Sequence, residues 1–293
     1  MFQSFRRTAA LLFGCLLLLS GCTVSDVLQS YQIEPPEQIQ QTGDASIHYI
    51  DVGQGDATLI QTAGKNILID SGTRASSDTL VNYLKAQGVT ELELCVATHP
   101  HEDHIGGMPD VFNEFMVKEL YMPTKTATTQ IFQSMVETAQ QRGVTISPAK
   151  VGDTFTIGDA TLHVLFPDRE YSDLNNNSVT IQMTLGGKTF LFTGDNEKES
   201  EAIILSNFGN SLKSDVLQAG HHGSDTSNTA DFLRAVSPSI VVISCGKDNS
   251  YGHPHEEVLQ RYEQLGMTVY RTDLDGNIVI FIDNGTLSVQ KGA

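Results

Sequence analysis

The sequence is poor in basic residues, and this scarcity limits the partners that the protein can bind. Of 293 residues, 18 are Lys or Arg and 35 are Asp or Glu, so the formal net charge is −17. Two of the 18 basic residues, Arg6 and Arg7, lie in residues 1–21, which hold no acid; the remainder therefore carries 16 basic against 35 acidic side chains, or −19. So acidic a surface repels phosphate backbones at long range. It argues against a broad nucleic-acid platform, but it leaves room for a small cationic site that binds one phosphate.

Cysteine is also scarce, and no two cysteines have metal-ligand spacing. Cys95 and Cys245 lie in the apolar runs "LELCVAT" and "IVVISCG", which are typical of strands. We expect either two buried free thiols or a disulfide there. A G-x-S-x-G elbow is likewise missing, so the sequence does not predict a serine nucleophile.

The N-terminal apolar run, residues 9–19, is too short for an ordinary membrane span of about 20 residues. Because Arg6 and Arg7 precede it and small residues follow, it is typical of a secretory signal. Leu19-Ser20-Gly21-Cys22 resembles a bacterial lipobox, which implies cleavage before Cys22 and lipidation of its thiol. We therefore predict a lipoprotein signal peptide (1–21), a polar tether (22–43) and an extracytoplasmic domain anchored by lipid to the bacterial cell membrane. The alternative is a plain secretory signal in which Cys22 is incidental.

Residues 44–293 are long enough for one domain with a large core. Apolar runs that end at glycines, such as "KNILIDSG" and "KTFLFTGD", predict strands in two halves of the chain. Helical spacing appears at 78–87, 131–143, 197–207, 228–236 and 255–265, and Asn284-Gly285 predicts the turn of a C-terminal hairpin. We expect an α/β fold with two sheets and helices outside each.

The stretch "VATHPHEDHIGG" at 96–107 follows one of the buried strands and crowds possible metal ligands together. In an extended loop alternate side chains share one side, so His99 and His101 can bind one ion while Asp103 and His104 turn toward a second. Neutral imidazole and carboxylate suit Zn²⁺, and Mn²⁺ or Fe as alternatives. With nine histidines in the whole chain, three in this spacing are not a chance surface loop.

This motif, H-x-H-x-D-H after a strand, resembles the hallmark of the metallo-β-lactamase superfamily. The stretches "IDVGQGDATLI", "THPHEDHIGG", "NNNSVTIQM", "FLFTGD", "LQAGHHGS" and "YGHPHEEVL" are more narrowly similar to the C-terminal hydrolase domain of ComEC-type competence proteins. A more distant similarity is to bacterial phosphorylcholine esterases of the same fold. The resemblance covers about residues 45–290 and implies an αβ/βα four-layer sandwich with two metal ions at the edge of the sheets.

The resemblance assigns roles to matching positions. It implies that His99 and His101 bind the first metal, that Asp103 and His104 bind the second, and that Asp195 bridges both. The alternative for Asp195 is an N-cap of the helix that follows. In "AGHHGS" we expect His221 to complete the second site and His222 to face the substrate as proton donor or phosphate contact, with the opposite assignment left open.

One departure from the broad superfamily is the absence of a histidine at 174–178, where many members place a further ligand of the first metal. We therefore expect three protein ligands and weaker binding at the first metal. For the substrate pocket we predict Asn177, Tyr251 and His253. The cluster at 249–258 also suits a helix N-terminus, with Pro254 at the first position.

These features predict a metal-dependent hydrolase of the binuclear zinc type, in which a metal-activated water attacks a phosphorus or carbonyl centre and Asp103 orients that water. The substrate class implied by the ComEC resemblance is a phosphodiester of DNA or nucleotides. The alternatives are a phosphorylcholine-type esterase that acts on envelope phosphodiesters and a non-catalytic ligand-binding lipoprotein. No obligate protein partner is expected.

Overall fold

The structure, a computed structural model, describes residues 45–292. The predicted signal peptide (1–21), Cys22 and the tether (22–43) lie outside the described residues. Within 45–292, no helix has the length and apolar character needed to cross a membrane.

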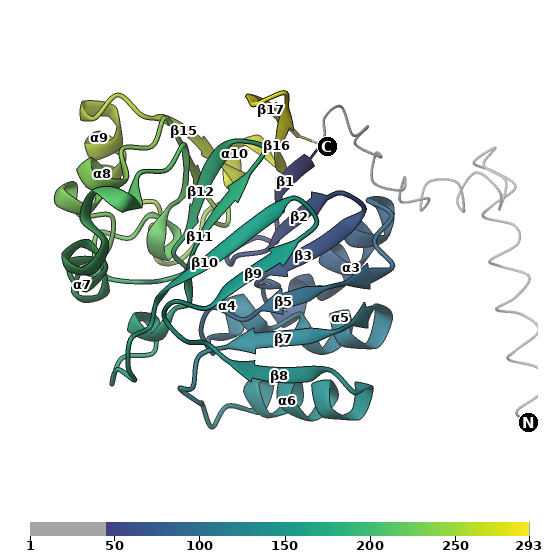
Figure 1. The fold of residues 1–293 in the computed structure, drawn as a ribbon. Helices are drawn as coiled ribbons and strands as arrows, with labels where there is room; N and C mark the ends of the chain where they lie inside the picture. The colour runs from purple at the N-terminus through teal and green to yellow at the C-terminus, as the bar shows by residue number, and fades with distance from the viewer. Residues whose placement is uncertain (1–44, 293) are drawn as a thin grey trace, which may run out of the picture. The chain divides into compact units, whose positions relative to one another are not determined.

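Two sheets stand face to face at the centre of the domain (Figure 1). The first sheet has the order β17-β16-β1-β2-β3-β5-β7-β8, and the second has the order β15-β14-β13-β12-β11-β10-β9. The strands of the first sheet are β1 (Ala45–Tyr49), β2 (Thr58–Thr62), β3 (Lys65–Ile69), β5 (Leu94–Val96), β7 (Glu119–Met122), β8 (Thr145–Pro148), β16 (Ile278–Asp283) and β17 (Thr286–Lys291). The strands of the second are β9 (Thr154–Ile157), β10 (Ala160–Phe166), β11 (Thr180–Leu185), β12 (Lys188–Phe192), β13 (Val216–Gln218), β14 (Ile240–Ile243) and β15 (Thr268–Arg271). A small separate pair joins β4 (Glu91–Leu92) to β6 (Met116–Val117).

Helices cover the outer face of each sheet (Figure 1). Outside the first sheet lie α3 (Ser77–Ala86), α5 (Met108–Glu114) and α6 (Gln130–Arg142), and outside the second lie α7 (Lys198–Phe208), α8 (Ala230–Val236) and α9 (Glu256–Gln264). Single turns are α4 (Glu102–Ile105), α10 (Thr272–Asp275), η1 (Arg74–Ser76), η2 (Asn175–Asn177), η3 (Gly209–Leu212) and η4 (Gly220–Gly223). The predicted four-layer sandwich is therefore confirmed.

Three apolar clusters hold the layers together. The central one lies between the sheets and joins residues such as Ile60 of β2 to residues such as Phe190 of β12. The outer two lie under the helices; Cys95 belongs to one and Cys245 to the other. Both cysteines are buried free thiols, because each sits on its own side of the sandwich.

Parallel pairing brings several strand ends to one edge. In the first sheet β3 pairs with β5, and in the second β12 pairs with β13 and β13 with β14, all in parallel. Loops at the carboxyl ends of such strands are where open α/β sheets bind ligands. The loops after β5, β12 and β13 carry His99, Asp195 and His221, so this edge holds the candidate site.

Candidate metal centre

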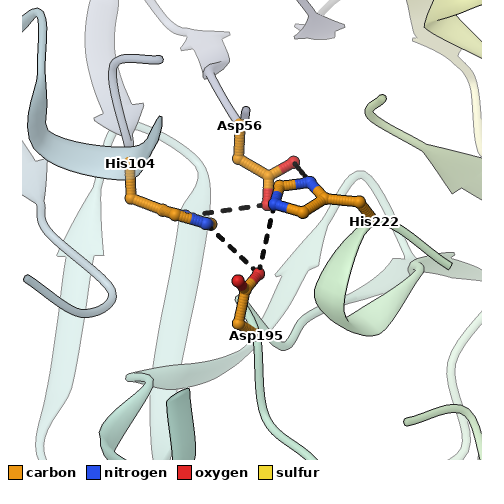
Figure 2. Close-up of side chains that lie close together, drawn as sticks. All are labelled: Asp56, His104, Asp195 and His222. Atoms are coloured by element: carbon orange, nitrogen blue, oxygen red, sulfur yellow. Dashed lines mark ion pairs between the residues drawn. The ribbon is translucent and has the colours of Figure 1, made fainter. Parts of the chain in front are cut away.

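Two groups of possible metal ligands meet at the edge of the sandwich. The first ligand set is His99, His101 and Asp195, and the second ligand set is Asp56, His104, Asp195 and His222. In each set, one ligand atom from every member lies within 4.8 Å of those of the other members. Figure 2 shows the second set with its four side chains pointing toward one another.

Asp195 belongs to both sets because its two oxygens face different ways. Its Oδ1 lies 3.2 Å from Nε2 of His104 and 3.6 Å from Nε2 of His222 (Figure 2). Its Oδ2 lies 3.6 Å from Nε2 of His99. Asp195 is buried three residues after the end of β12, so its carboxylate is held where it could contact an ion in each set.

The hydrogen bonds of the second set leave its ligand atoms free. His104 Nδ1 lies 2.8 Å from Oδ2 of Asp70 and His222 Nδ1 lies 2.9 Å from the carbonyl oxygen of Ser244, so both rings donate through Nδ1. Their Nε2 atoms and Asp195 Oδ1 are buried and have no hydrogen-bond partner within residues 45–292. Unpaired buried polar atoms are costly. Three of them converging on one point fit a cation.

The spacing of these atoms also fits a metal. A tetrahedral zinc ion with bonds of about 2.0–2.1 Å to nitrogen holds its ligand atoms about 3.3–3.4 Å apart. In the first set, Nε2 of His99 lies 3.0 Å from Nδ1 of His101. Asp103 faces the second set from the cavity side, with Oδ2 3.4 Å from Nε2 of His222. Two divalent ions, zinc among them, are therefore compatible with the residues present.

The electrostatics of the site also call for positive charge. Burial lowers the pKa of His104, but the carboxylates of Asp195 and Asp70 outweigh it and raise that pKa well above its usual value. Burial likewise lowers the pKa of His222, yet Asp195 and Asp56 bring it to about 9. Burial raises the pKa of Asp195, but His104 and His222 hold it well below its usual range. Protons on two imidazoles thus balance the acids, and a metal ion would replace them.

The ligand loop, residues 97–107 after β5, is held by Asp70 and by two glycines. Asp70 follows β3 and accepts hydrogen bonds from Thr98 N (2.8 Å) and Thr98 Oγ1 (2.7 Å) as well as from His104. A Cβ on Gly106 would lie 2.2 Å from the backbone nitrogen of Arg74, and one on Gly55 would lie 2.3 Å from the backbone oxygen of Asp103. The backbones of the neighbouring loops therefore approach the ligand loop so closely that only glycine, which has no Cβ, fits at these two positions.

The conformation of the ligand loop differs in part from the expected extended one. His101 is extended, but α4 begins at the next residue, so Asp103 and His104 lie on a helical turn. The backbone amides of Ile105 and Gly106 donate hydrogen bonds to the carbonyl oxygens of His101 and Glu102, respectively. This turn directs His104 into the interior, where its Nδ1 donates a hydrogen bond to Asp70.

The structure brings His222, rather than His221, into the second set. Both adopt left-handed backbone conformations, with φ of 50° and 54°, inside η4. This sharp turn buries His222 among the second set and leaves His221 facing the cavity. His221 is absent from both sets: its Nδ1 lies 3.4 Å from Oε1 of Glu197 and 3.2 Å from Oγ1 of Thr226, and its Nε2 lies 3.7 Å from Oδ2 of Asp195. Of the two assignments left open by the sequence, this geometry favours His222 as the second-site ligand.

A polar cavity of about 340 Å³ borders the two sets at His101 and Asp195. It is lined by Gln54, His101, Glu102, Asp103, Asn175, Asp195, His221 and Tyr251. Asn177 is not among them, contrary to expectation, because it is wholly buried and its amide bonds the backbone of Tyr171. His253 lies behind the rim, with its ring stacked between those of Tyr251 (5.6 Å) and His222 (6.2 Å).

Four contributors to the site were not predicted from the sequence: Gln54, Glu102, Asn175 and Glu197. Gln54 accepts a hydrogen bond from Gly246 N at 3.0 Å and so links the loop after β1 to the loop after β14. Glu197 follows Asp195 by two residues, and this proximity was the available signal. Asp56 and Asp70 both lie beside His104, with Oδ2 atoms 3.8 Å and 2.8 Å from its Nδ1.

Comparisons with known proteins agree with this geometry. The family profile described as the metallo-beta-lactamase superfamily matches residues 50–247. ComE operon protein 3 of Bacillus subtilis is 33% identical over 269 residues, which cover 85% of this chain and 34% of that protein. Competence protein ComA of Neisseria gonorrhoeae is 32% identical over 87% of this chain and 35% of its own length. The chain thus spans about a third of the length of these relatives.

Solved structures share the fold at low sequence identity. The metallo-beta-lactamase fold protein YhfI of Bacillus subtilis aligns with a TM-score of 0.54 and 13% identity, covering 85% of this chain and all of that one. CmlA, a diiron beta-hydroxylase from Streptomyces venezuelae, aligns with a TM-score of 0.57 and 14% identity over 82% of this chain and 54% of its own. With the fold and the profile in agreement, the chain belongs to the metallo-β-lactamase superfamily and is related to ComEC-type competence proteins.

Proposed function

We propose that this protein is a metal-dependent hydrolase of phosphodiesters that uses two divalent ions, zinc in the first instance. The observation that carries the proposal is Asp195, whose two oxygens face two ligand sets on the floor of one cavity. The buried atoms of the second set that lack hydrogen-bond partners support a bound cation rather than a purely structural histidine cluster.

Ions bound here would supply an activated water and polarise the phosphoryl oxygens. The remaining work falls to side chains at the cavity wall. Asp103 lies between the second set and the cavity, where its carboxylate can orient the attacking water. His221 has Nδ1 directed to Glu197 and Thr226, and its Nε2 lies 3.7 Å from Oδ2 of Asp195 at the cavity, where it can contact the phosphate or donate a proton to the leaving oxygen.

The resemblance to competence proteins directs the proposal to phosphodiesters of DNA or nucleotides. A second candidate is a phosphorylcholine-type ester, and the composition of the cavity favours it. None of the residues that line the cavity is Lys or Arg, whereas Glu102 and the exposed ring of Tyr251 are at its wall. A carboxylate and an aromatic face can attract a quaternary ammonium group.

We further propose that the domain is held outside the cell on a lipid at Cys22. The support is the lipobox resemblance at residues 19–22. Growth with labelled palmitate tests it, since label should enter the wild type and not Cys22→Ser. Label in both proteins would contradict the anchor and leave the enzymatic proposal intact.

The enzymatic proposal is tested by one assay series on the purified protein. Bound metal is measured first, and then hydrolysis of bis-p-nitrophenyl phosphate, single-stranded DNA and p-nitrophenylphosphorylcholine. Asp103→Ala and His104→Ala should abolish turnover, whereas His163→Ala, which removes an exposed histidine of β10, should not. A protein that binds no metal, or turnover that survives in both variants, refutes the mechanism. Bound metal without hydrolysis of any substrate would favour a ligand-binding protein.

A further inference from the structure

The three consecutive asparagines of η2 have different tasks, and one of them is unexplained by packing. Asn177 bonds the backbone around Tyr171, as described above. Asn176 Oδ1 accepts hydrogen bonds from Glu197 N (3.2 Å) and Ser200 Oγ (2.6 Å), which ties η2 to the start of α7. Asn175 is 92% buried, since 8% of its surface is exposed, and it is the member that reaches the cavity.

Glu197 fixes which way the amide of Asn175 points. Asn175 Nδ2 donates to Oε1 of Glu197 at 3.3 Å, and a carboxylate can only accept in this contact. The opposite end of the amide, Oδ1, is therefore a carbonyl oxygen, and it is buried without a hydrogen-bond partner in the part of the chain that the structure describes. Glu197 also contacts His221 Nδ1, so it holds two cavity side chains at once.

The two ligand sets differ in their number of ligands, and Asn175 lines the same cavity as the first set, which has fewer. The second set has four members and Asp103 beside them, whereas the first has three, His99, His101 and the shared Asp195, with His221 Nε2 lying 3.7 Å from Asp195 Oδ2. His101, Asp195 and Asn175 line one cavity. We propose that Asn175 Oδ1, oriented by Glu197, is an additional protein ligand of the first metal.

This inference rests on the proposed two-metal function and adds a preference between metals to it. An amide oxygen is a harder donor than an imidazole, and oxygen ligands suit Mn²⁺ while nitrogen ligands suit Zn²⁺. The first set would therefore bind Mn²⁺ better than a set completed by imidazole. Asn175→His should reverse that preference.

The test is titration of metal-free protein with MnCl₂ and, separately, ZnCl₂, followed by calorimetry and, for Mn²⁺, by the loss of its free-ion electron paramagnetic resonance signal. The wild type should bind two ions. In Asn175→Ala the weaker Mn²⁺ site should lose at least about tenfold in affinity, the scale seen when a partner of a metal ligand is removed. The stronger site is the internal control and should not change. Asn175→His should raise the Zn²⁺ affinity of the weaker site.

Glu197 provides a second measurement that a folding defect would not imitate. Glu197→Gln keeps an oxygen that accepts from Asn175 Nδ2, so its metal affinity should stay near that of the wild type, whereas Glu197→Ala should lower it at the weaker site alone. X-ray absorption of the Mn²⁺-loaded protein should show one fewer oxygen neighbour in Asn175→Ala. Unchanged Mn²⁺ affinity in Asn175→Ala overturns the inference, even if turnover falls. A wild type that binds no metal overturns the proposed function instead.

Discussion

Asp70→Asn is the sharpest probe of how the second ligand set is held. Asp70 is fully buried and receives three hydrogen bonds, two from Thr98 and one from His104. Its φ of 58° is left-handed, a conformation that Asn tolerates far better than Ala. Asparagine therefore removes the charge and one acceptor while keeping the shape of the loop.

The expected loss follows from the donors that remain. An asparagine amide offers one acceptor end, so at least one of the three donors must face an NH₂ group. The loss of a hydrogen bond to a charged acceptor costs about 1.5–3 kcal/mol, which corresponds to a fall in melting temperature of about 5–10 °C for a domain of this size. Because Asp70 also keeps the His104 proton on Nδ1, we expect metal affinity to fall about 10- to 100-fold.

The assay is calorimetric metal titration of Asp70→Asn beside the wild type, with thermal unfolding of both in the presence of EDTA. Asp275→Asn is the matched control, since Asp275 is a partly exposed carboxylate that pairs with Lys291 (2.8 Å). If Asp70→Asn bound metal within about threefold of the wild type, Asp70 would not orient His104 as described.

Other predictions concern protons, histidines and glycines. Burial and the opposing acids leave the pKa of His222 at about 9, above its unfolded value near 6.5. Protonated His222 therefore adds about 3 kcal/mol to the free energy of unfolding below pH 6.5, and this stabilisation is lost as the pH rises to 9. The melting temperature of metal-free protein should fall over that range, and His222→Gln should flatten the decline. Metal binding at pH 7 should release protons, which titrations in buffers of different ionisation enthalpy will detect; no release would contradict the charge balance described for the second set. His222→Ala should lose metal, whereas His221→Ala should keep both ions and lose turnover. Gly106→Ala should lower the free energy of unfolding by about 3 kcal/mol or more, because the added Cβ would meet the backbone of Arg74. Gly88→Ala has open space around its Cβ, so only backbone strain should destabilise it. Equal melting temperatures for the two variants would contradict the close approach at Gly106.

Much of the fold was predictable because local patterns agree with it. The helices expected at 131–143 and 255–265 are α6 and α9, and the turn expected at Asn284-Gly285 joins β16 to β17. The short strands β7, β8 and β9 escaped prediction. They have four residues each, too few to show a period.

The site was harder to predict where identical residues are neighbours in the sequence. His221 and His222 cannot be told apart by residue type, and the two left-handed residues that separate their directions leave no periodic trace. The same holds for Asn175 and Asn177, which a 3₁₀ turn sends to opposite tasks. Asp70, by contrast, follows β3 just as Thr98 follows β5, and the parallel pairing of those strands places them together.

Because the ligand sets draw on both sheets, an ion bound there would act as a clasp between the two halves of the chain. His99, His101 and His104 come from the loop after β5, whereas Asp195 and His222 come from loops of the second sheet, so neither half alone holds a complete set. The stabilisation by a bound ion increases with the concentration of free metal: at 100 times Kd it adds about 2.7 kcal/mol to the free energy of unfolding. The melting temperature of this protein should therefore serve as a gauge of the metal available to it.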